Sequence, residues 1–217
     1  MRKEFESPAW FAWQLANLDV QGTGTSNGST GTSRALIEMC YNHLSQIAPA
    51  MTANDMPRLA QMKRGLALSA YRRPIQVLVY VVCWTDDGWR YLLLHRVPAR
   101  GAFWQGVSGG VEWGETLLHA ARREVLEETG LHSRELHSAD CSYTFDLQEE
   151  WKRFYAPRTR EIAEHVFVAV VAGQEPELSP EKHDDWRWCT YEEALGVLVW
   201  PENVKALQCC QQLLHDM

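Results

Sequence analysis

Apolar residues recur at helical spacing in the first third of the chain. Over residues 34–47 they return every three or four positions, and Ser33 is suited to cap the start of this helix. Pro49 would end it, because a proline interrupts the hydrogen bonds of a helix interior. A second stretch with the same spacing follows Asp55. The pattern therefore predicts a helical N-terminal extension over residues 34–70.

From residue 71 onward the pattern changes to short apolar runs separated by turn residues. Pro74 opens a continuous, β-branched run over 75–84, which is typical of a strand buried on both faces. Asp87-Gly88 favours a hairpin turn into the next strand. The predicted strands are 75–84, 89–96, 136–145, 165–172 and 185–189, with a Gly-rich segment at 104–111 and helices at 116–129, 190–197 and 202–215. This order predicts an α/β (α+β) domain over residues 71–217, with a mixed sheet and helices on both sides.

The first 33 residues carry no chemical motif. Residues 1–20 pass from charged to apolar, and residues 21–33 are rich in Gly, Ser and Thr, which is typical of a flexible linker. The opening residues lack the apolar core of a secretory signal. The longest apolar run, 77–84, is far below the roughly 18 residues that a membrane span needs. We therefore expect a cytoplasmic protein with no membrane partner, divided into segments 1–20, 21–33, 34–70 and 71–217.

Charge and cysteine content narrow the classes of partner. The chain has 21 Lys and Arg against 28 Asp and Glu, a formal net charge of −7. Nucleic-acid polymers need a basic face, so no such partner is expected. Small anionic ligands stay open, because a bound cation can reverse the local field. The six cysteines show neither a C-x-x-C motif nor the Cys-His spacing of a zinc site, so we expect reduced thiols.

Three carboxylates lie on one face of the predicted helix 116–129. Glu124, Glu127 and Glu128 are three and four positions apart, so their side chains are neighbours. Like charges at this spacing repel, and carboxylates near a helix C-terminus also oppose the helix dipole. Mg²⁺ would offset both effects, since it is commonly held by a few carboxylates and the phosphates of a substrate. The alternative is an acidic helix face exposed to solvent.

The residues around this cluster extend the pattern. From Gly109 to Leu131 the chain reads G-x5-E-x7-R-E-V-x-E-E-x-G-L, which matches all nine fixed positions of the signature of the Nudix hydrolase superfamily. The sequence therefore resembles a Nudix hydrolase. This resemblance implies the Nudix fold, an α/β/α sandwich with a mixed sheet. It also implies an enzyme that hydrolyses a diphosphate linkage with Mg²⁺ or Mn²⁺ as cofactor.

The resemblance also implies roles for the residues of the signature. It implies a metal bound by four residues, namely Gly109 through its carbonyl, Glu124, Glu127 and Glu128. Glu115 and Arg123 are expected to support the geometry of loop and helix around these ligands. In the family, water attacks a phosphorus of the diphosphate while metal ions neutralise its oxygens. Glu127 and Glu128 are the catalytic residues that follow from this comparison.

Shorter motifs are similar to those of the dihydroneopterin triphosphate diphosphatase subgroup. They are Arg72-Arg73-Pro74, Leu93-Leu94-His95-Arg96, Phe103-Trp104-Gln105 and Tyr155-Ala156-Pro157. They imply a small substrate, a pterin or nucleoside triphosphate, which is cleaved to a monophosphate and pyrophosphate. Dinucleoside polyphosphates, nucleotide sugars and oxidised nucleotides stay open as substrates. A non-catalytic Nudix-fold module that binds a nucleotide is the alternative of another class, although the intact glutamates favour an enzyme. A homodimer is compatible with either function.

Three residues outside the signature are candidates for contacting the substrate. Arg96, at the end of a predicted strand, could hold a phosphate or be an ordinary surface charge. Trp104 and Tyr155 could stack on a planar base or pterin ring, or belong to the core.

One segment departs from the subgroup pattern. In the subgroup a Glu-His pair precedes a Trp-containing strand, and its glutamate is a further metal ligand. Aligning His183 and Trp188 with that pattern puts Lys182 at the ligand position. A lysine there would repel a metal but could hold a phosphate. We expect Glu181, from a bulged loop, or Glu164 to act as the outer ligand or general base.

Overall fold

The structure is a computed structural model that describes residues 39–217, with the exception of residues 41, 47, 51, 53 and 70. The expected N-terminal segment 1–20 and linker 21–33 lie outside the described residues. The chain divides into two units, Met1–Ala70 and Tyr71–Met217. Within the described residues, no helix is both long and apolar enough to cross a membrane.

The described part of the first unit is helical. Residues 39–40 and 42–46 are helical, a 3-10 turn η1 spans Ala48–Ala50, and α3 spans Met56–Ser69. Asp55 precedes α3, and its carboxylate accepts hydrogen bonds from the backbone amide (3.1 Å) and the hydroxyl (2.6 Å) of Thr52. Leu59 of α3 is buried. The helix predicted to follow Asp55 is therefore confirmed.

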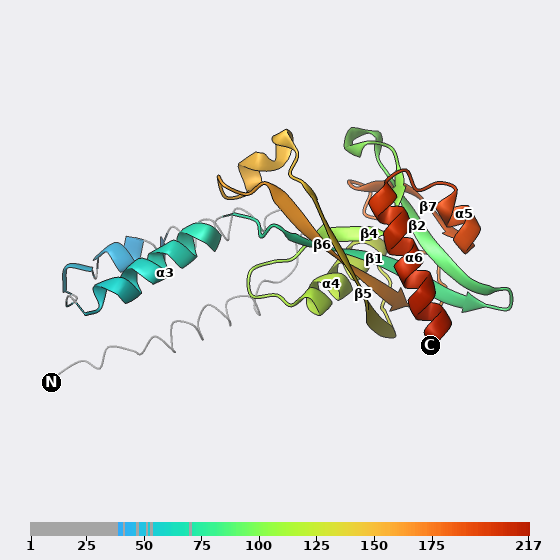
Figure 1. The fold of residues 1–217 in the computed structure, drawn as a ribbon, viewed down its shortest axis with the longest axis horizontal. Coiled ribbons are helices and arrows are strands. Elements are labelled where there is room, and N and C mark those ends of the chain that lie inside the picture. Colours follow the sequence, from blue (N-terminus) through green and yellow to red (C-terminus); the bar gives the residue numbers. More distant parts are fainter. Residues whose placement is uncertain (1–38, 41, 47, 51, 53, 70) are drawn as a thin grey trace. The chain divides into compact units, whose positions relative to one another are not determined.

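The second unit is built on a mixed sheet (Figure 1). Among the described residues its strands are β1 (Ile75–Thr85), β2 (Gly88–Arg96), β3 (Trp104–Gln105), β4 (Val107–Gly110), β5 (Glu135–Asp146), β6 (Glu161–Val170) and β7 (His183–Cys189). The order across the sheet is β3-β2-β1-β6-β5, while β4 pairs with β1 and β7 pairs with β2. β1 and β6 run parallel, and the other pairs of these strands are antiparallel.

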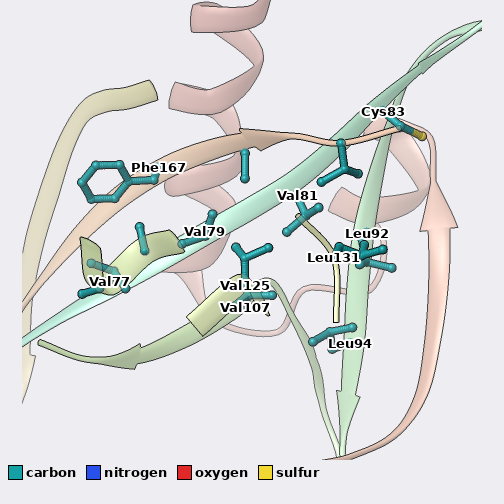
Figure 2. Packing of buried hydrophobic residues seen from close by; sticks show 14 of the residues in the cluster. Val77, Val79, Val81, Cys83, Leu92, Leu94, Val107, Val125, Leu131 and Phe167 are labelled. Atoms are coloured by element: carbon teal, nitrogen blue, oxygen red, sulfur yellow. The ribbon is translucent and has the colours of Figure 1, made fainter. Parts of the chain in front are cut away.

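Helices cover both faces of this sheet. They are α4 (Leu117–Thr129), α5 (Tyr191–Leu195) and α6 (Pro201–Asp216), and the 3-10 turns η2 (Pro98–Arg100) and η3 (Glu149–Phe154) complete the unit. Alternate residues of a strand point to opposite faces. The odd-numbered residues from Val77 to Cys83 pack with α4 (Figure 2), and the even-numbered residues from Leu78 to Val82 pack with α6. The predicted sandwich, with a first strand buried on both faces, is confirmed.

Three elements differ from the prediction. The Gly-rich segment forms two short strands separated by Gly106, where a Cβ atom would lie 2.9 Å from the Val79 carbonyl oxygen. β6 begins at Glu161, and its first half alternates buried residues with exposed or partly exposed ones. The predicted strand covered only the apolar run that follows. The turn η3 was not predicted, since Glu149–Phe154 lacks a helical apolar spacing.

Candidate active site

The ends of α4 are set by its local sequence. Thr116 caps the N-terminus, and its hydroxyl accepts a hydrogen bond from the His119 amide at 3.2 Å. Gly130 ends the helix with a φ of 65°, a conformation that favours glycine, and its amide donates to the Leu126 carbonyl at 2.8 Å. These caps fix where α4 begins and ends, while its packing on the sheet decides which residues are buried.

The three predicted ligands on α4 differ in exposure. The side chain of Glu128 is completely buried, that of Glu124 is 6% exposed, and that of Glu127 is 51% exposed. Glu124 and Glu128 therefore lie between α4 and the sheet, while Glu127 lies at the solvent side. The sequence predicted that all three lie on one face of the helix. The structure adds that part of this face is buried and part is exposed to solvent.

Gly109 of β4 makes room for Glu124. A Cβ atom at position 109 would lie only 1.9 Å from Cδ of Glu124, so no other residue fits without displacing the carboxylate. The carboxylate thus rests directly against the backbone of β4. The structure therefore brings together two of the predicted ligands, the Glu124 side chain and the Gly109 backbone.

Arg123 ties the preceding loop to α4. Its guanidinium donates to both carboxylate oxygens of Glu115, at 2.9 and 3.0 Å, and to the Gly110 carbonyl at 2.8 Å. It also donates to Glu124 at 2.7 Å and to Glu127 at 3.3 Å. Burial would raise the pKa of Glu115, but the hydrogen bonds from Arg123 outweigh it and the pKa is lowered. Arg123 thus joins Glu115 and the Gly110 backbone to Glu124, and the supporting role of Glu115 and Arg123 stays a prediction.

A further arginine contacts this loop, and the sequence indicated it only as part of the motif Arg72-Arg73-Pro74, without this role. Arg73 donates to the backbone carbonyls of Glu112 and Glu115, at 2.9 and 3.1 Å. Its position just before β1 places it against the loop that leads into α4. Only the three-dimensional pairing of β1 with β4 reveals this contact, because 42 positions separate Arg73 and Glu115 in the chain.

The buried carboxylates have unsatisfied oxygens. Within the described residues, Glu124 Oε2 and Glu128 Oε2 are buried and have no hydrogen-bond partner. Burial raises the pKa of Glu124 to about 7 in spite of Arg123 and Lys182, and burial also raises the pKa of Glu128. Two buried carboxylates with unpartnered oxygens, one of them against the Gly109 backbone, are oxygen donors of the kind that suits a hard divalent cation.

A lysine stands at these carboxylates. Lys182 Nζ lies 2.9 Å from Glu128 Oε1 and 3.6 Å from Glu124 Oε2. Burial would lower the pKa of Lys182, but attraction to Glu128 outweighs it and raises the pKa, so the group is an ammonium. In the described part of the chain, no three His, Cys, Asp or Glu side chains converge closely enough to hold a metal by themselves. The Lys182 ammonium group thus contacts both Glu124 and Glu128, whereas the Glu127 carboxylate contacts Arg123.

His183 is buried beside Glu128. Its Nε2 lies 3.9 Å from Glu128 Oε2, and neither ring nitrogen finds a hydrogen-bond partner among the residues described. Burial lowers its pKa to about 3, helped by repulsion from Arg96 and Lys182, so the ring is neutral at pH 7. The sequence alignment pointed to His183, but not to its contact with α4.

The two acidic candidates for an outer ligand are placed differently from expectation. Glu181 is exposed, and its carbonyl accepts a hydrogen bond from Arg100 at 3.2 Å; its neighbour Lys182 is the residue that reaches α4. Glu164 is buried and accepts hydrogen bonds from Gln76 and Tyr143. Glu164 lies on the same face of β6 as Val166 and Val168, which pack with α6. Phe167 and Ala169 lie on the opposite face, which packs with α4. Glu164 therefore does not stand beside the α4 carboxylates.

The substrate-binding candidates are also separated. Arg96 is half-buried, its buried Nε has no hydrogen-bond partner in the described chain, and it lies close enough to Glu128 to feel its charge. Trp104 lies between His95, at 5.0 Å between ring centres, and Arg187, whose guanidinium is 4.1 Å from the ring centre. Tyr155 packs in a small core cluster and is 9% exposed, so it is a core aromatic rather than an open stacking surface.

Known proteins resemble this chain in sequence and in fold. The NUDIX domain family matches residues 74–208. The chain is 34% identical over 142 residues to the dihydroneopterin triphosphate diphosphatase of Escherichia coli strain K12, which covers 64% of this chain and 92% of that protein. A NUDIX hydrolase structure from Listeria monocytogenes has a TM-score of 0.58 at 27% identity, covering 66% of this chain and 96% of that one. The E. coli dihydroneopterin triphosphate pyrophosphohydrolase structure has a TM-score of 0.53 at 26% identity, covering 68% and 99%.

Proposed function

The chain belongs to the NUDIX family of hydrolases, enzymes that act on phosphorus-containing anhydrides, and from this premise we propose its substrate class and metal. We propose that it cleaves a nucleoside or pterin triphosphate to the monophosphate and pyrophosphate, with Mg²⁺ or Mn²⁺ as cofactor. The observation that carries this proposal is the pair of buried carboxylates, Glu124 and Glu128, each with one oxygen that has no hydrogen-bond partner among the described residues.

The proposed metal ligands follow from this geometry. Glu124, Glu128 and the carbonyl of Gly109 would hold the ion, and Glu127, which contacts Arg123, would be the ligand on the exposed side. When bound, a divalent ion neutralises phosphate oxygens and lowers the pKa of a water molecule. Arg123 keeps Glu124 oriented through the contacts that it shares with Glu115.

The proposed reaction needs one proton acceptor and a clamp on the phosphates. A water oxygen forms a bond to phosphorus, the anhydride bond to pyrophosphate breaks, and one water proton passes to a carboxylate. Glu127 is suited to accept that proton, because its side chain is half-exposed at the edge of the carboxylate cluster. Arg96 is suited to bind a phosphate oxygen, because its guanidinium is positively charged, only partly buried and close enough to Glu128 to feel its charge.

The choice of substrate rests on the similarity to the E. coli enzyme, whose name gives dihydroneopterin triphosphate. A panel assay with Mg²⁺ and with Mn²⁺ tests it, using dihydroneopterin triphosphate, the deoxynucleoside triphosphates, 8-oxo-dGTP, a dinucleoside polyphosphate and ADP-ribose. Pyrophosphate release, with one triphosphate far ahead in kcat/KM, is the expected result. Preference for a dinucleoside polyphosphate, a nucleotide sugar or an oxidised nucleotide would contradict the substrate but keep the reaction class.

The ion pair between Lys182 and Glu128 favours a second candidate of another class, a module that binds a nucleotide without cleaving it. Binding of a nucleotide without hydrolysis of any substrate in the panel would select this module and overturn the enzyme proposal.

A further inference from the structure

The loop before β7 sends an ammonium group into the carboxylate pair of α4, where a metal is expected. We propose that Lys182 is a built-in counter-ion of Glu124 and Glu128 in the ligand-free protein. A divalent metal then enters the site together with the phosphates of the substrate, which take over the ammonium group. The metal site rests on the function proposed above, whereas the role of Lys182 goes beyond it.

Burial makes a counter-ion necessary. The Glu128 side chain is completely buried, and a buried carboxylate without a cation is strongly unfavourable. Arg123 pairs with Glu124, but within the described residues no arginine forms an ion pair with Glu128. Lys182 supplies the missing positive charge at 2.9 Å. The ligand-free site is therefore neutralised from inside the chain.

The lysine and a metal compete for the same two carboxylates. Mg²⁺ binds carboxylate oxygens at about 2.0–2.1 Å, and the ammonium group already contacts Glu128 Oε1. It also lies 3.6 Å from Glu124 Oε2, one of the oxygens proposed above for the metal, so a cation bound there would be repelled by the ammonium group. A free metal ion must therefore displace Lys182, and its affinity is reduced by the strength of the contacts that it breaks.

The displacement needs only the side chain to move. The Lys182 carbonyl accepts a hydrogen bond from the Val97 amide at 3.1 Å, and its own amide donates to Ser179 at 3.0 Å, so the backbone is anchored. The side chain is 30% exposed and has a flexible four-carbon stem. Phosphate oxygens are strong acceptors for an ammonium group. The phosphates of a triphosphate would therefore bind the Lys182 ammonium group when a metal ion replaces it at the carboxylates. As a result, the metal ion and the triphosphate each increase the affinity of the protein for the other.

The substitution Lys182→Met tests this with two binding measurements that require no turnover. The first measures the affinity for Mn²⁺ alone, from the electron paramagnetic resonance of free Mn²⁺. We expect the variant to bind Mn²⁺ about tenfold more tightly than the unaltered protein or better. The second measures, by calorimetry, the affinity for the preformed complex of Mn²⁺ with a non-hydrolysable methylene analogue of a nucleoside triphosphate. There we expect the variant to bind several-fold more weakly, because the contact from Lys182 to phosphate is lost.

The control is Lys152→Met. Lys152 also pairs with a glutamate, Glu149, but at an exposed surface turn, so neither affinity should change. A second readout is the melting temperature without nucleotide. Mn²⁺ should raise it more in Lys182→Met than in the unaltered protein, because the variant has no internal counter-ion.

Opposite shifts of the two affinities support the proposal, since a merely structural role would move both in the same direction. Unchanged Mn²⁺ affinity in a folded Lys182→Met variant would overturn it. Lys182→Gln replaces that variant if it does not fold, with the same expectations. A chain that hydrolyses nothing in the panel but shows the opposite shifts would refute the proposed activity and keep the role of Lys182. An active enzyme without those shifts would support the proposed activity and refute the role of Lys182.

Discussion

The three glutamates of α4 stand in three environments, and this decides what each can do. Glu128 has Lys182 as its partner and no contact with solvent, Glu124 has Arg123 and the Gly109 backbone, and Glu127 is half-exposed. Spacing in the sequence identified all three residues. It could not predict which of the three is most buried, because burial depends on how α4 is rotated about its axis against the sheet.

The first prediction concerns Glu128→Gln. The amide keeps the shape of the side chain but cannot supply the negative charge, so kcat should fall by about 10²-fold or more while the fold is retained. Steady-state kinetics with the best substrate of the panel, alongside circular dichroism, measure this. Glu127→Gln should also lower kcat, and Glu135→Gln, at an exposed position of β5, should not. Near-full activity of Glu128→Gln would show that the metal ligands are wrongly assigned.

The second prediction is a pH dependence of the metal-free protein. Burial raises the pKa of Glu124 from 4.5 to about 7, so the folded state favours the protonated carboxyl. The stability that this contributes is fully present below pH 4.5 and is lost as the pH rises through 7, an effect on the order of 3 kcal/mol. In a chelator, the melting temperature of the unaltered protein should therefore fall relative to that of Glu124→Gln over this window. Parallel melting curves for the two proteins would contradict the raised pKa.

At the scale of elements, the site depends on how α4, its preceding loop and β4 fit together. Arg123 joins helix and loop, and Gly109 lets the backbone of β4 approach the carboxylate of Glu124. The site is thus a junction of three segments rather than a property of one helix.

The third prediction compares two adjacent glycines. Gly109→Ala should weaken Mn²⁺ binding by about 10- to 100-fold, because the added methyl group would displace the Glu124 carboxylate. Gly110→Ala is the matched control, since a Cβ atom there has nothing within 4 Å. Titration of both variants with Mn²⁺ measures the effect. Equal Mn²⁺ affinities of the two variants would show that metal binding does not depend on the position of Glu124 against β4.

The elements themselves were largely predictable, and the faces of the sheet were not. α4 follows from Thr116, Gly130 and the spacing between them, and β1 follows from its continuous apolar run. The position of Glu164 depends on β6 starting at Glu161 and on its register with β1, which no short-range pattern contains. The glutamate consequently lies under α6, in a polar contact with Gln76 and Tyr143. The contact between Lys182 and Glu128 joins residues 54 positions apart, which is equally beyond local patterns.

At the scale of the whole molecule, every residue of the candidate site lies in the unit Tyr71–Met217. The fourth prediction is that deleting residues 1–33 leaves kcat and KM within about twofold of their full-length values, because no candidate residue is removed. Kinetics of the shortened protein, at matched metal and substrate concentrations, measure this. A large loss of activity would mean that the N-terminal residues take part in binding or in assembly.

The pairing of β1 with β6 bears on how the protein is made. β1 is buried on both faces, yet Gln76 meets its partner Glu164 only 88 positions later in the chain. During synthesis the apolar strand β1 therefore leaves the ribosome well before β6, the parallel strand that pairs with one of its edges. This interval is when chaperones would be needed most. A nascent chain that is released before Glu161 leaves that side open, and we expect such fragments to aggregate rather than fold.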